Sequence, residues 1–335
     1  MKTTKLLSLI LSILMLLTSL CLFTACDSDE NDKDGIDTDL EINVAVLNGT
    51  TGFGAAKLIS DASSEKAALN YKFTVETDAS NITAALINGS VDIAALPTNA
   101  AANLYNKTRG SVQIAAINTL GVLYLVTNNT EINSMEDLRG KTVYCPAQNP
   151  AFIFEALCRA NGLTPGKDIT IDTSHAQPAQ LNAAVAAGDI SIAVLPEPMV
   201  TIATSKNKDL KVSLDLTETW ETVYGENSLA QGCIVVRTEW ANEHPKELKK
   251  FLEEYKASIE FTVSAPKEAS ELIVSANIFA GNAAVAEKAI PKCNIIYIDG
   301  EDMKSALDTF FSKLYATAPA SIGGSIPDDG IYYKK

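Results

Sequence analysis

Hydrophobic residues along this chain come in short runs of strand length, separated by segments with the spacing of amphipathic helices. Residues 42–47, INVAVL, predict a buried β-strand, and the glycine-rich stretch 49–54, GTTGFG, predicts the turn that follows it. Residues 244–261, HPKELKKFLEEYKASIEF, carry apolar side chains at helical spacing on one face. Strands and helices that alternate in this way predict an α/β fold.

One pattern of helix, glycine, strand and Leu-Pro occurs twice. Residues 84–100 read AALINGSVDIAALPTNA, and residues 183–199 read AAVAAGDISIAVLPEPM, so that Gly188 lies 99 residues after Gly89. The same offset places the strand and turn at residues 42–59 over a second strand and turn. We interpret this as two α/β halves of shared architecture.

Two long apolar segments are expected to connect the halves. Residues 119–128, TLGVLYLVTN, predict a strand that leads out of the first lobe, and residues 232–240, GCIVVRTEW, predict the strand that returns. The predicted first lobe therefore comprises residues 42–128 and 236–335, and the second comprises residues 129–235. Two extended crossings of this kind allow hinge closure around a ligand.

The loops that follow the predicted strands are the expected ligand site. In open α/β sheets, ligands lie outside the carboxyl ends of the strands and beside the N-termini of helices. Two facing lobes would place four such loops around one small molecule. The predicted contacts on these loops are Gly49, Thr50, Thr51, Gly52, Thr98, Asn99, Gln148, Asn149 and Glu197.

The glycine-rich turn does not fit the known nucleotide motifs. A phosphate-binding loop needs Gly-Lys-Ser/Thr, whereas Lys57 lies three residues after Gly54, and the dinucleotide fingerprint has a different glycine spacing. We expect its backbone N–H groups and the hydroxyls of Thr50 and Thr51 to contact a ligand. The alternative is a helix start without a ligand.

The residue types on these loops favour a neutral or weakly cationic heterocycle. Only four arginines occur in the chain, and none lies on the four loops, so the sequence shows no bidentate clamp for an anion. Glu197 suits a cation or a ring N–H, and Trp220 is a candidate for stacking on a planar ring. An anion held by backbone N–H groups remains the alternative.

The N-terminus predicts an exported, lipid-anchored protein. Two lysines precede the apolar run 6–23, and Phe-Thr-Ala-Cys ends at Cys26, which is typical of a lipoprotein signal peptide covering residues 1–25. Residues 26–41 are acidic and form the expected tether, with lipid on Cys26. An uncleaved membrane anchor is the alternative, because the apolar run nearly spans a bilayer.

Charge and composition exclude several classes of function. The 41 acidic and 27 basic residues give a net charge of −14, which repels nucleic acid. With two histidines and no Cys-x-x-Cys pair, we expect no metal site, no cofactor and no catalytic triad. The cysteines of the folded body sit in apolar contexts that favour small buried thiols, although a disulfide stays open. These are Cys145, Cys158, Cys233 and Cys293.

Several motifs together resemble bacterial ABC-transporter solute-binding lipoproteins. They are the segment before Cys26, the acidic tether, MEDLRGKTV at 135–143, GDISIAVLPEPMVT at 188–201 and HPKELKKFLEEY at 244–255. The chain is similar to the group that includes binders of sulfonates, nitrate and thiamine-pyrimidine precursors. The resemblance implies a type II periplasmic-binding-protein fold that captures a small molecule for a permease.

This resemblance also implies partners and a location. We expect a monomer, held by its lipid at the outer face of the cytoplasmic membrane, that delivers its ligand to a permease and ATPase. A thiamine-related pyrimidine is the favoured ligand, and a sulfonate- or nitrate-type anion is the alternative. Two more candidate functions are a ligand-sensing receptor subunit and a pyrimidine synthase, although the catalytic histidine and cysteine-rich motif of such a synthase are missing from the sequence.

Overall fold

The computed structural model describes residues 35–334. The chain divides into two units, residues 1–36 and 37–335. The predicted signal peptide and Cys26 lie outside the described residues, as does most of the predicted tether. Within the described residues, every helix and strand belongs to the second unit, and no helix there combines the length and the apolar character needed to cross a bilayer.

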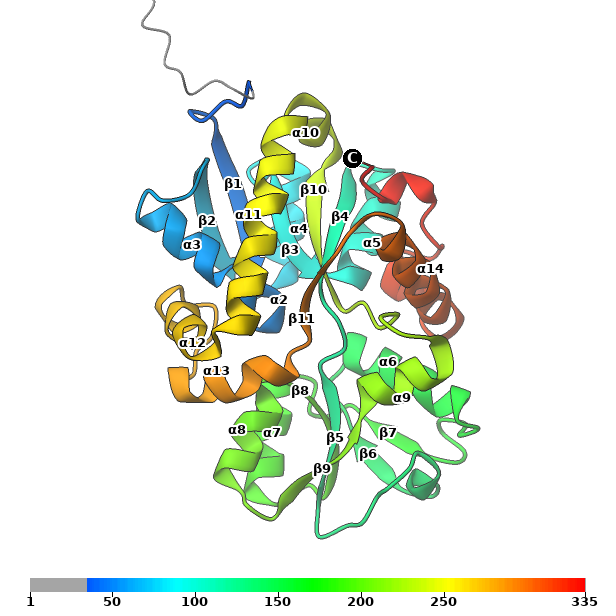
Figure 1. Cartoon of the computed structure of the whole chain (residues 1–335). Coiled ribbons are helices and arrows are strands. Elements are labelled where there is room, and N and C mark those ends of the chain that lie inside the picture. Colours follow the sequence, from blue (N-terminus) through cyan, green and yellow to red (C-terminus); the bar gives the residue numbers. More distant parts are fainter. Residues whose placement is uncertain (1–34, 335) are drawn as a thin grey trace, which may run out of the picture. The chain divides into compact units, whose positions relative to one another are not determined.

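The first lobe of the second unit is built on a six-stranded mixed sheet (Figure 1). Helix α11 crosses one face of this sheet, and α4 and α5 lie on the other. In spatial order the strands are β11 (Ile295–Ile298), β4 (Val112–Thr119), β10 (Gly232–Arg237), β3 (Ile93–Pro97), β1 (Glu41–Leu47) and β2 (Asn70–Glu76). The helices are α2 (Thr50–Phe53), α3 (Ala56–Ser63), α4 (Ala79–Asn88), α5 (Thr98–Thr108), α10 (Thr238–Glu243), α11 (Pro245–Ser264), α12 (Pro266–Ser275), α13 (Ala283–Ala289) and α14 (Gly300–Thr317), with short 3₁₀ turns η2 (Ile290–Lys292), η3 (Pro319–Ile322) and η4 (Asp329–Ile331).

The second lobe has a five-stranded sheet of the same design. Its strands are, in spatial order, β7 (Thr170–Asp172), β6 (Thr142–Tyr144), β8 (Ile192–Pro196), β5 (Leu123–Asn128) and β9 (Leu210–Asp215). Its helices are α6 (Asn149–Ala160), α7 (Pro178–Ala187), α8 (Met199–Lys206) and α9 (Leu216–Tyr224), with the 3₁₀ turn η1 at Glu136–Leu138. The predicted two-lobed α/β fold is therefore confirmed.

The internal repeat is visible at the level of single elements. Helices α4 and α7 both end on a glycine in the left-handed conformation, Gly89 at φ +78° and Gly188 at φ +88°, which an L side chain adopts only with strain. In each lobe three parallel strands are followed by an antiparallel fourth. That fourth strand is β10 in the first lobe and β5 in the second. Each of these strands is the first that the chain forms after it has crossed from the other lobe.

The crossings between lobes differ from the sequence prediction. The expected continuous strand 119–128 is wrong, because β4 ends at Thr119 in the first sheet and β5 begins at Leu123 in the second. Gly121 lies between them, where a Cβ would come within 2.2 Å of Thr217 Oγ1, so the chain turns in a space that only glycine fits.

The return crossing ends earlier than the sequence predicted. Strand β10 joins the first sheet from residue 232 and gives way to α10 at residue 238, whereas the expected boundary lay at 235/236 and the strand was expected to reach 240. Apolar composition shows that a segment is a buried strand but not which sheet it joins, and this is why both boundaries were misplaced.

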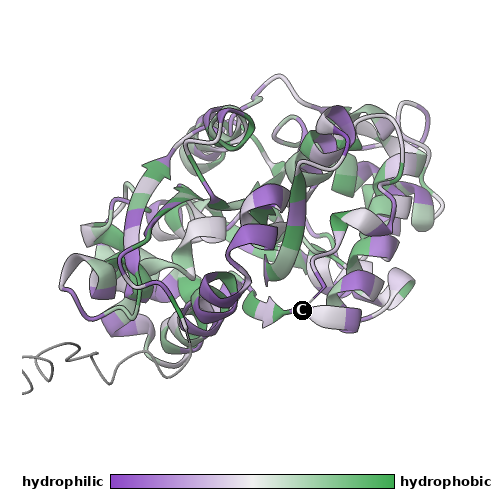
Figure 2. Ribbon diagram, turned by 90° about the horizontal axis from the view of Figure 1, so that it is seen from above, coloured by the Kyte–Doolittle hydropathy of each residue, from purple (hydrophilic) through white to green (hydrophobic). Residues whose placement is uncertain are grey.

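The buried core extends through both lobes. The largest cluster of buried apolar side chains includes Phe154 of α6, Trp220 of α9, and Phe310 of α14. Figure 2 shows hydrophobic strands between helices with hydrophilic outer turns. The predicted apolar face of α11 is confirmed, because Leu248, Phe251, Leu252, Tyr255 and Ile259 are all buried. The two lobes also share part of this core, because helix α14 of the first lobe packs against α6 of the second.

Candidate ligand-binding site

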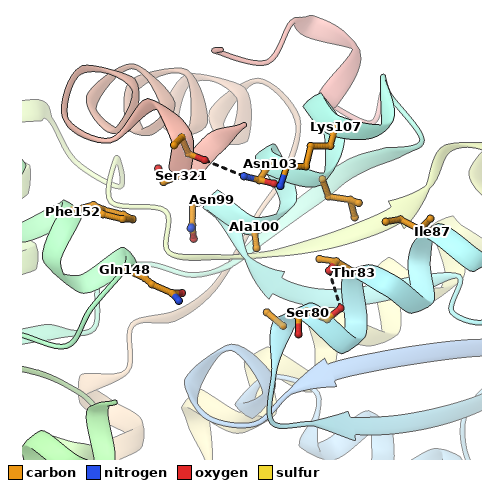
Figure 3. A pocket seen from close by; sticks show the side chains of 13 residues that line it. Ser80, Thr83, Ile87, Asn99, Ala100, Asn103, Lys107, Gln148, Phe152 and Ser321 are labelled. Atoms are coloured by element: carbon orange, nitrogen blue, oxygen red, sulfur yellow. Dashed lines mark hydrogen bonds between the residues drawn. The ribbon is translucent and has the colours of Figure 1, made fainter. Parts of the chain in front are cut away.

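A cavity of about 530 Å³ lies between the lobes. It is lined by residues of α4 and α5 from the first lobe, by the start of α6 from the second lobe, and by η3 near the C-terminus. Figure 3 shows Asn99 between the two lobes, with Gln148 and Phe152 on one side and Ser80 and Thr83 on the other. The site is therefore formed where elements from three distant parts of the chain meet.

Three helices begin at the cavity. Helix α5 starts directly after β3, and α6 starts at Asn149, with Pro150 in its first turn. Helix α4 starts at Ala79, where the Asp78 carboxylate accepts a hydrogen bond from the Ser80 N–H at 2.8 Å. The first N–H groups of a helix have no partner within the helix, and its N-terminus carries partial positive charge. The starts of α5 and α6, which have no side-chain cap, are thus suited to an anionic or strongly accepting group, whereas the start of α4 is already capped by Asp78.

The charged lining of the cavity has one sign. Lys107 on the third turn of α5 is a lining residue, and no aspartate or glutamate of the described residues is. The other polar lining side chains are neutral: Ser80, Thr83, Asn99, Asn103, Gln148 and Ser321. The chain as a whole has a net charge of −14, so a cavity lined by one lysine and no carboxylate differs in sign from the rest of the protein.

Polar atoms without partners gather at this site. Two lining residues, Asn99 and Ser321, each have a buried side-chain oxygen with no hydrogen-bond partner among the described residues. The same holds for Asn149 Oδ1, although Asn149 only adjoins the lining residue Gln148 and does not itself line the cavity. Burying such an atom unpaired costs about 1–3 kcal/mol, so each oxygen calls for a ligand or water. An amide can turn by 180° to present its NH₂ group instead, so that Asn99 and Asn149 can serve an acceptor as well as a donor.

The glycine-rich turn of residues 49–52 does not line this cavity. The Gly49 N–H donates to the Ile278 carbonyl at 2.8 Å, and the Thr51 carbonyl accepts from Asn118 Nδ2 at 2.9 Å. A Cβ on Gly52 would lie 2.4 Å from the Leu47 carbonyl oxygen. The turn therefore packs against other parts of the first lobe, and the close approach of the Leu47 carbonyl accounts for glycine at position 52.

Thr98 and Glu197, two of the predicted loop contacts, point into the protein. Thr98 is fully buried, and its N–H donates to the Gln231 carbonyl at 3.1 Å. The Glu197 carboxylate accepts hydrogen bonds from the Thr201 N–H at 3.1 Å and hydroxyl at 2.9 Å, and Lys292 Nζ lies 4.0 Å away. Burial raises the pKa of Glu197 above its usual range. This carboxylate is therefore a buried structural group and does not line the cavity.

The prediction that Trp220 stacks on a ligand is wrong. Its side chain has no exposed surface, and its ring lies 4.6 Å from that of Tyr224 and 6.0 Å from that of Phe310, measured between centroids. The indole Nε1–H donates to Ser228 Oγ at 3.0 Å. Trp220 is a core residue at the contact between α9 and α14. Its four-residue spacing from Leu216 and Tyr224 is a helical stripe that could have indicated this.

Several lining residues were missed by the sequence analysis. Asn103 and Lys107 follow Asn99 at intervals of four on α5, and this spacing was available in the sequence. Ser321 lies in the C-terminal segment, which looked like a simple turn-rich tail. Its position depends on contacts made 217 and 216 residues away in sequence, from Asn103 to the Ala320 carbonyl and from Asn106 to the Ile322 carbonyl.

The four cysteines of the folded unit are free and buried. Burial raises the pKa of Cys158 and of Cys233 to about 12, so both are thiols at neutral pH. The expectation of small buried thiols is confirmed.

The sequence model of one protein family matches residues 61–286 of the chain. That family is described as the ABC transporter, phosphonate, periplasmic substrate-binding protein. The chain belongs to this family. Its members are extracytoplasmic solute-binding proteins that bind small molecules and work with a permease and an ATPase, and they are not enzymes. The resemblance inferred from sequence motifs is thereby confirmed.

Solved structures support the same fold. An ABC transporter protein from Parabacteroides distasonis aligns with 26% identity and a TM-score of 0.74, over 89% of this chain and 100% of that one. The periplasmic aliphatic sulphonate binding protein SsuA from Escherichia coli aligns with 12% identity and a TM-score of 0.69, over 88% and 92%.

A third solved structure is the alkanesulfonate-binding protein SsuA from Xanthomonas axonopodis pv. citri bound to MOPS. It aligns with 13% identity and a TM-score of 0.61, over 86% of this chain and 94% of that one. No curated protein matches the chain.

Proposed function

We propose that this solute-binding protein captures a small organic oxyanion, a sulfonate or a phosphonate, in the cavity between its lobes. The observation that carries the proposal is the lining: helix N-termini and Lys107 surround the space, and no carboxylate of the described residues does. Partial positive charge at helix N-termini stabilises a bound anion, the more so where water is excluded.

Each part of such a ligand finds a partner in the cavity. The oxyanion can accept hydrogen bonds from the N–H groups of Asn99 and Ala100 at the start of α5, from that of Asn149 at the start of α6, and from the side-chain amides of Asn99 and Gln148. The organic portion can contact the Phe152 ring and Leu104. Because Asn99 and Gln148 come from different lobes, a ligand that contacts both stabilises the state in which the lobes are close.

The sequence favoured a thiamine-related pyrimidine because of Glu197, Trp220, the amides of Asn99, Gln148 and Asn149, and the lack of arginine on the loops, and two of these grounds are lost. Trp220 has no exposed ring face, and the Glu197 carboxylate is buried against Thr201. The family description names phosphonate, and two similar structures are described as sulfonate-binding proteins. Both chemistries present a tetrahedral oxyanion on a carbon atom.

The lipid anchor is part of the same proposal. Attachment of lipid at Cys26 would hold the protein at the outer face of the cytoplasmic membrane, as a monomer within reach of its permease. The wild-type protein should then incorporate labelled palmitate and the Cys26→Ser variant should not, and a wild-type protein without label would remove the anchor from the proposal.

Isothermal titration calorimetry tests the ligand class directly. The purified protein is titrated with ethanesulfonate, ethylphosphonate, nitrate and a thiamine-related pyrimidine. We expect saturable binding of one or both organic oxyanions, weakened about tenfold or more in Asn99→Ala and in Gln148→Ala. Asn88→Ala, which changes an exposed asparagine of α4 outside the cavity, is the matched control. Binding of the pyrimidine with no binding of either organic oxyanion would overturn the proposal.

A further inference from the structure

The cavity continues as a groove along two helices of the first lobe. On α5, Asn99, Asn103 and Lys107 recur at intervals of four residues, and on α4 the lining residues Thr83 and Ile87 do the same. Figure 3 shows Lys107 and Ile87 at the end of the cavity that lies away from Gln148 and Phe152. The space is therefore elongated, with the interlobe contact at one end.

Apolar side chains alternate with polar ones along this groove. Ala100 and Leu104 line it from α5, and Ala79 and Ile87 line it from the two ends of α4, with Thr83 and Asn103 between. The Ile87 side chain is 62% exposed, the largest exposed fraction among the exposed large hydrophobic side chains of the described residues. Covering such a side chain with an apolar ligand chain is favourable, at about 25 cal/mol per Å² of apolar surface removed from water.

A cation without an anionic partner stands at the far end. Lys107 forms no ion pair with any described residue, and no carboxylate of the described residues lines the groove. Eight residues of α-helix separate it from Asn99, which corresponds to about 12 Å along the axis. The groove thus offers a site for a negative group at both ends, and Ala100, Leu104 and Ile87 supply apolar surface along its length.

We propose that the physiological ligand carries two acidic groups separated by an apolar spacer. One oxyanion lies at the N-termini of α5 and α6, and the second lies at Lys107. This inference rests on the proposed function, because it takes the first oxyanion site as given, and it adds the length and the second charge of the ligand. A singly charged molecule with an apolar tail is the competing occupant, and the experiment separates the two.

The experiment compares pairs of sulfonates of equal length. Ethanesulfonate, octane-1-sulfonate and octane-1,8-disulfonate are titrated into the purified protein at low ionic strength, with the corresponding phosphonates in parallel. We expect the eight-carbon dianion to bind about threefold to fivefold more tightly than the eight-carbon monoanion, as an exposed ion pair allows. Lys107→Gln should remove this difference between the two eight-carbon ligands, and should weaken ethanesulfonate and octane-1-sulfonate by the same factor.

The control variant is Lys66→Gln, which removes the same charge from an exposed residue of the first lobe outside the cavity. It should keep the preference for the dianion. Equal binding of the two eight-carbon ligands by the wild type, or an equal loss of the preference in both variants, would overturn the inference while leaving the proposed function intact. Failure of ethanesulfonate and ethylphosphonate to bind at all would instead remove the proposed function and this inference with it.

Discussion

Glu197 shows how a single acidic residue is held out of water in this protein. It directly follows β8 of the second lobe, its side chain has no exposed surface, and Lys292 of the first lobe lies 4.0 Å from its carboxylate. Hydrogen bonds from Thr201 and the charge of Lys292 favour the ionised form, but burial outweighs them and raises the pKa.

The raised pKa of Glu197 makes stability depend on pH with a defined sign. The folded protein binds this proton more tightly than the unfolded chain, so the stabilisation is present at acid pH and is lost as the pH rises past the folded-state pKa. Glu197→Gln should therefore gain stability relative to wild type, by about 1 kcal/mol, as the pH rises from about 4 to about 8. Urea unfolding across this range measures it. Glu271→Gln, at an exposed glutamate of α12, should show no such trend, and a flat difference for Glu197→Gln would contradict the assignment.

At this scale the sequence predicted residue types better than residue surroundings. Asn99 and Gln148 were placed correctly at the starts of helices that face the cavity. Trp220 and Glu197 were assigned to the ligand because tryptophan and glutamate have the right chemistry for it. Trp220 packs on Phe310, which is distant in sequence, although the helical spacing of Leu216, Trp220 and Tyr224 was a local sign of burial. Glu197 is held by Thr201, four residues later, and lies 4.0 Å from Lys292, a neighbour that the sequence does not reveal.

The C-terminal segment acts as one wall of the cavity although it contains only short 3₁₀ turns. Asn106 Nδ2 donates to the Ile322 carbonyl at 2.6 Å and to the Ser325 carbonyl at 2.7 Å. Further along, Tyr105 donates to Asp328, and Tyr332 donates to Asp308 at 2.6 Å. These bonds hold η3 against α5 and thereby fix the position of Ser321.

Loosening this wall should weaken ligand binding without unfolding the protein. Asn106→Ala removes both hydrogen bonds to the segment, which we expect to cost about 1–3 kcal/mol of stability and to reduce oxyanion affinity about threefold to tenfold. Calorimetry gives the affinity, and amide hydrogen exchange of residues 319–327 should become faster.

The matched control is Asn161→Ala, which loses a hydrogen bond to the Leu157 carbonyl at the C-terminal end of α6. That variant should retain wild-type affinity and wild-type exchange in residues 319–327. Unchanged affinity in Asn106→Ala together with faster exchange would show that η3 is not part of the site.

Elements with a repeated local signature were predictable, and elements defined by long-range pairing were not. The pairs α4 with α7 and β3 with β8 follow from glycine and proline at fixed positions in each half. Strands β5 and β10 were recognised as strands, but their sheets were not. Strand β5 belongs to the second sheet although it was assigned to the first lobe, and the first part of β10 belongs to the first sheet although it was assigned to the second lobe. Only the three-dimensional pairing decides that membership.

At the scale of the whole molecule, the two lobes share buried surface beside the cavity. Phe310 of α14 contacts Trp220 of the second lobe, and α14 packs on α6. On the other side, Tyr124 of β5 donates a hydrogen bond to the Lys292 carbonyl at 2.9 Å. Wide opening would expose the Phe310–Trp220 contact to water, which disfavours it.

We therefore expect a small closure rather than a large hinge motion. Small-angle X-ray scattering of the wild type should show nearly the same radius of gyration with and without a saturating organic oxyanion. Phe310→Leu removes the aromatic contact, so its ligand-free form should be larger and should contract on binding, because ligand contact with both lobes then supplies the closing free energy. Its apparent affinity should fall in proportion to the closed fraction. A marked contraction of the wild type on binding would show instead that the shared core does not hold the lobes together, and that the ligand alone closes them.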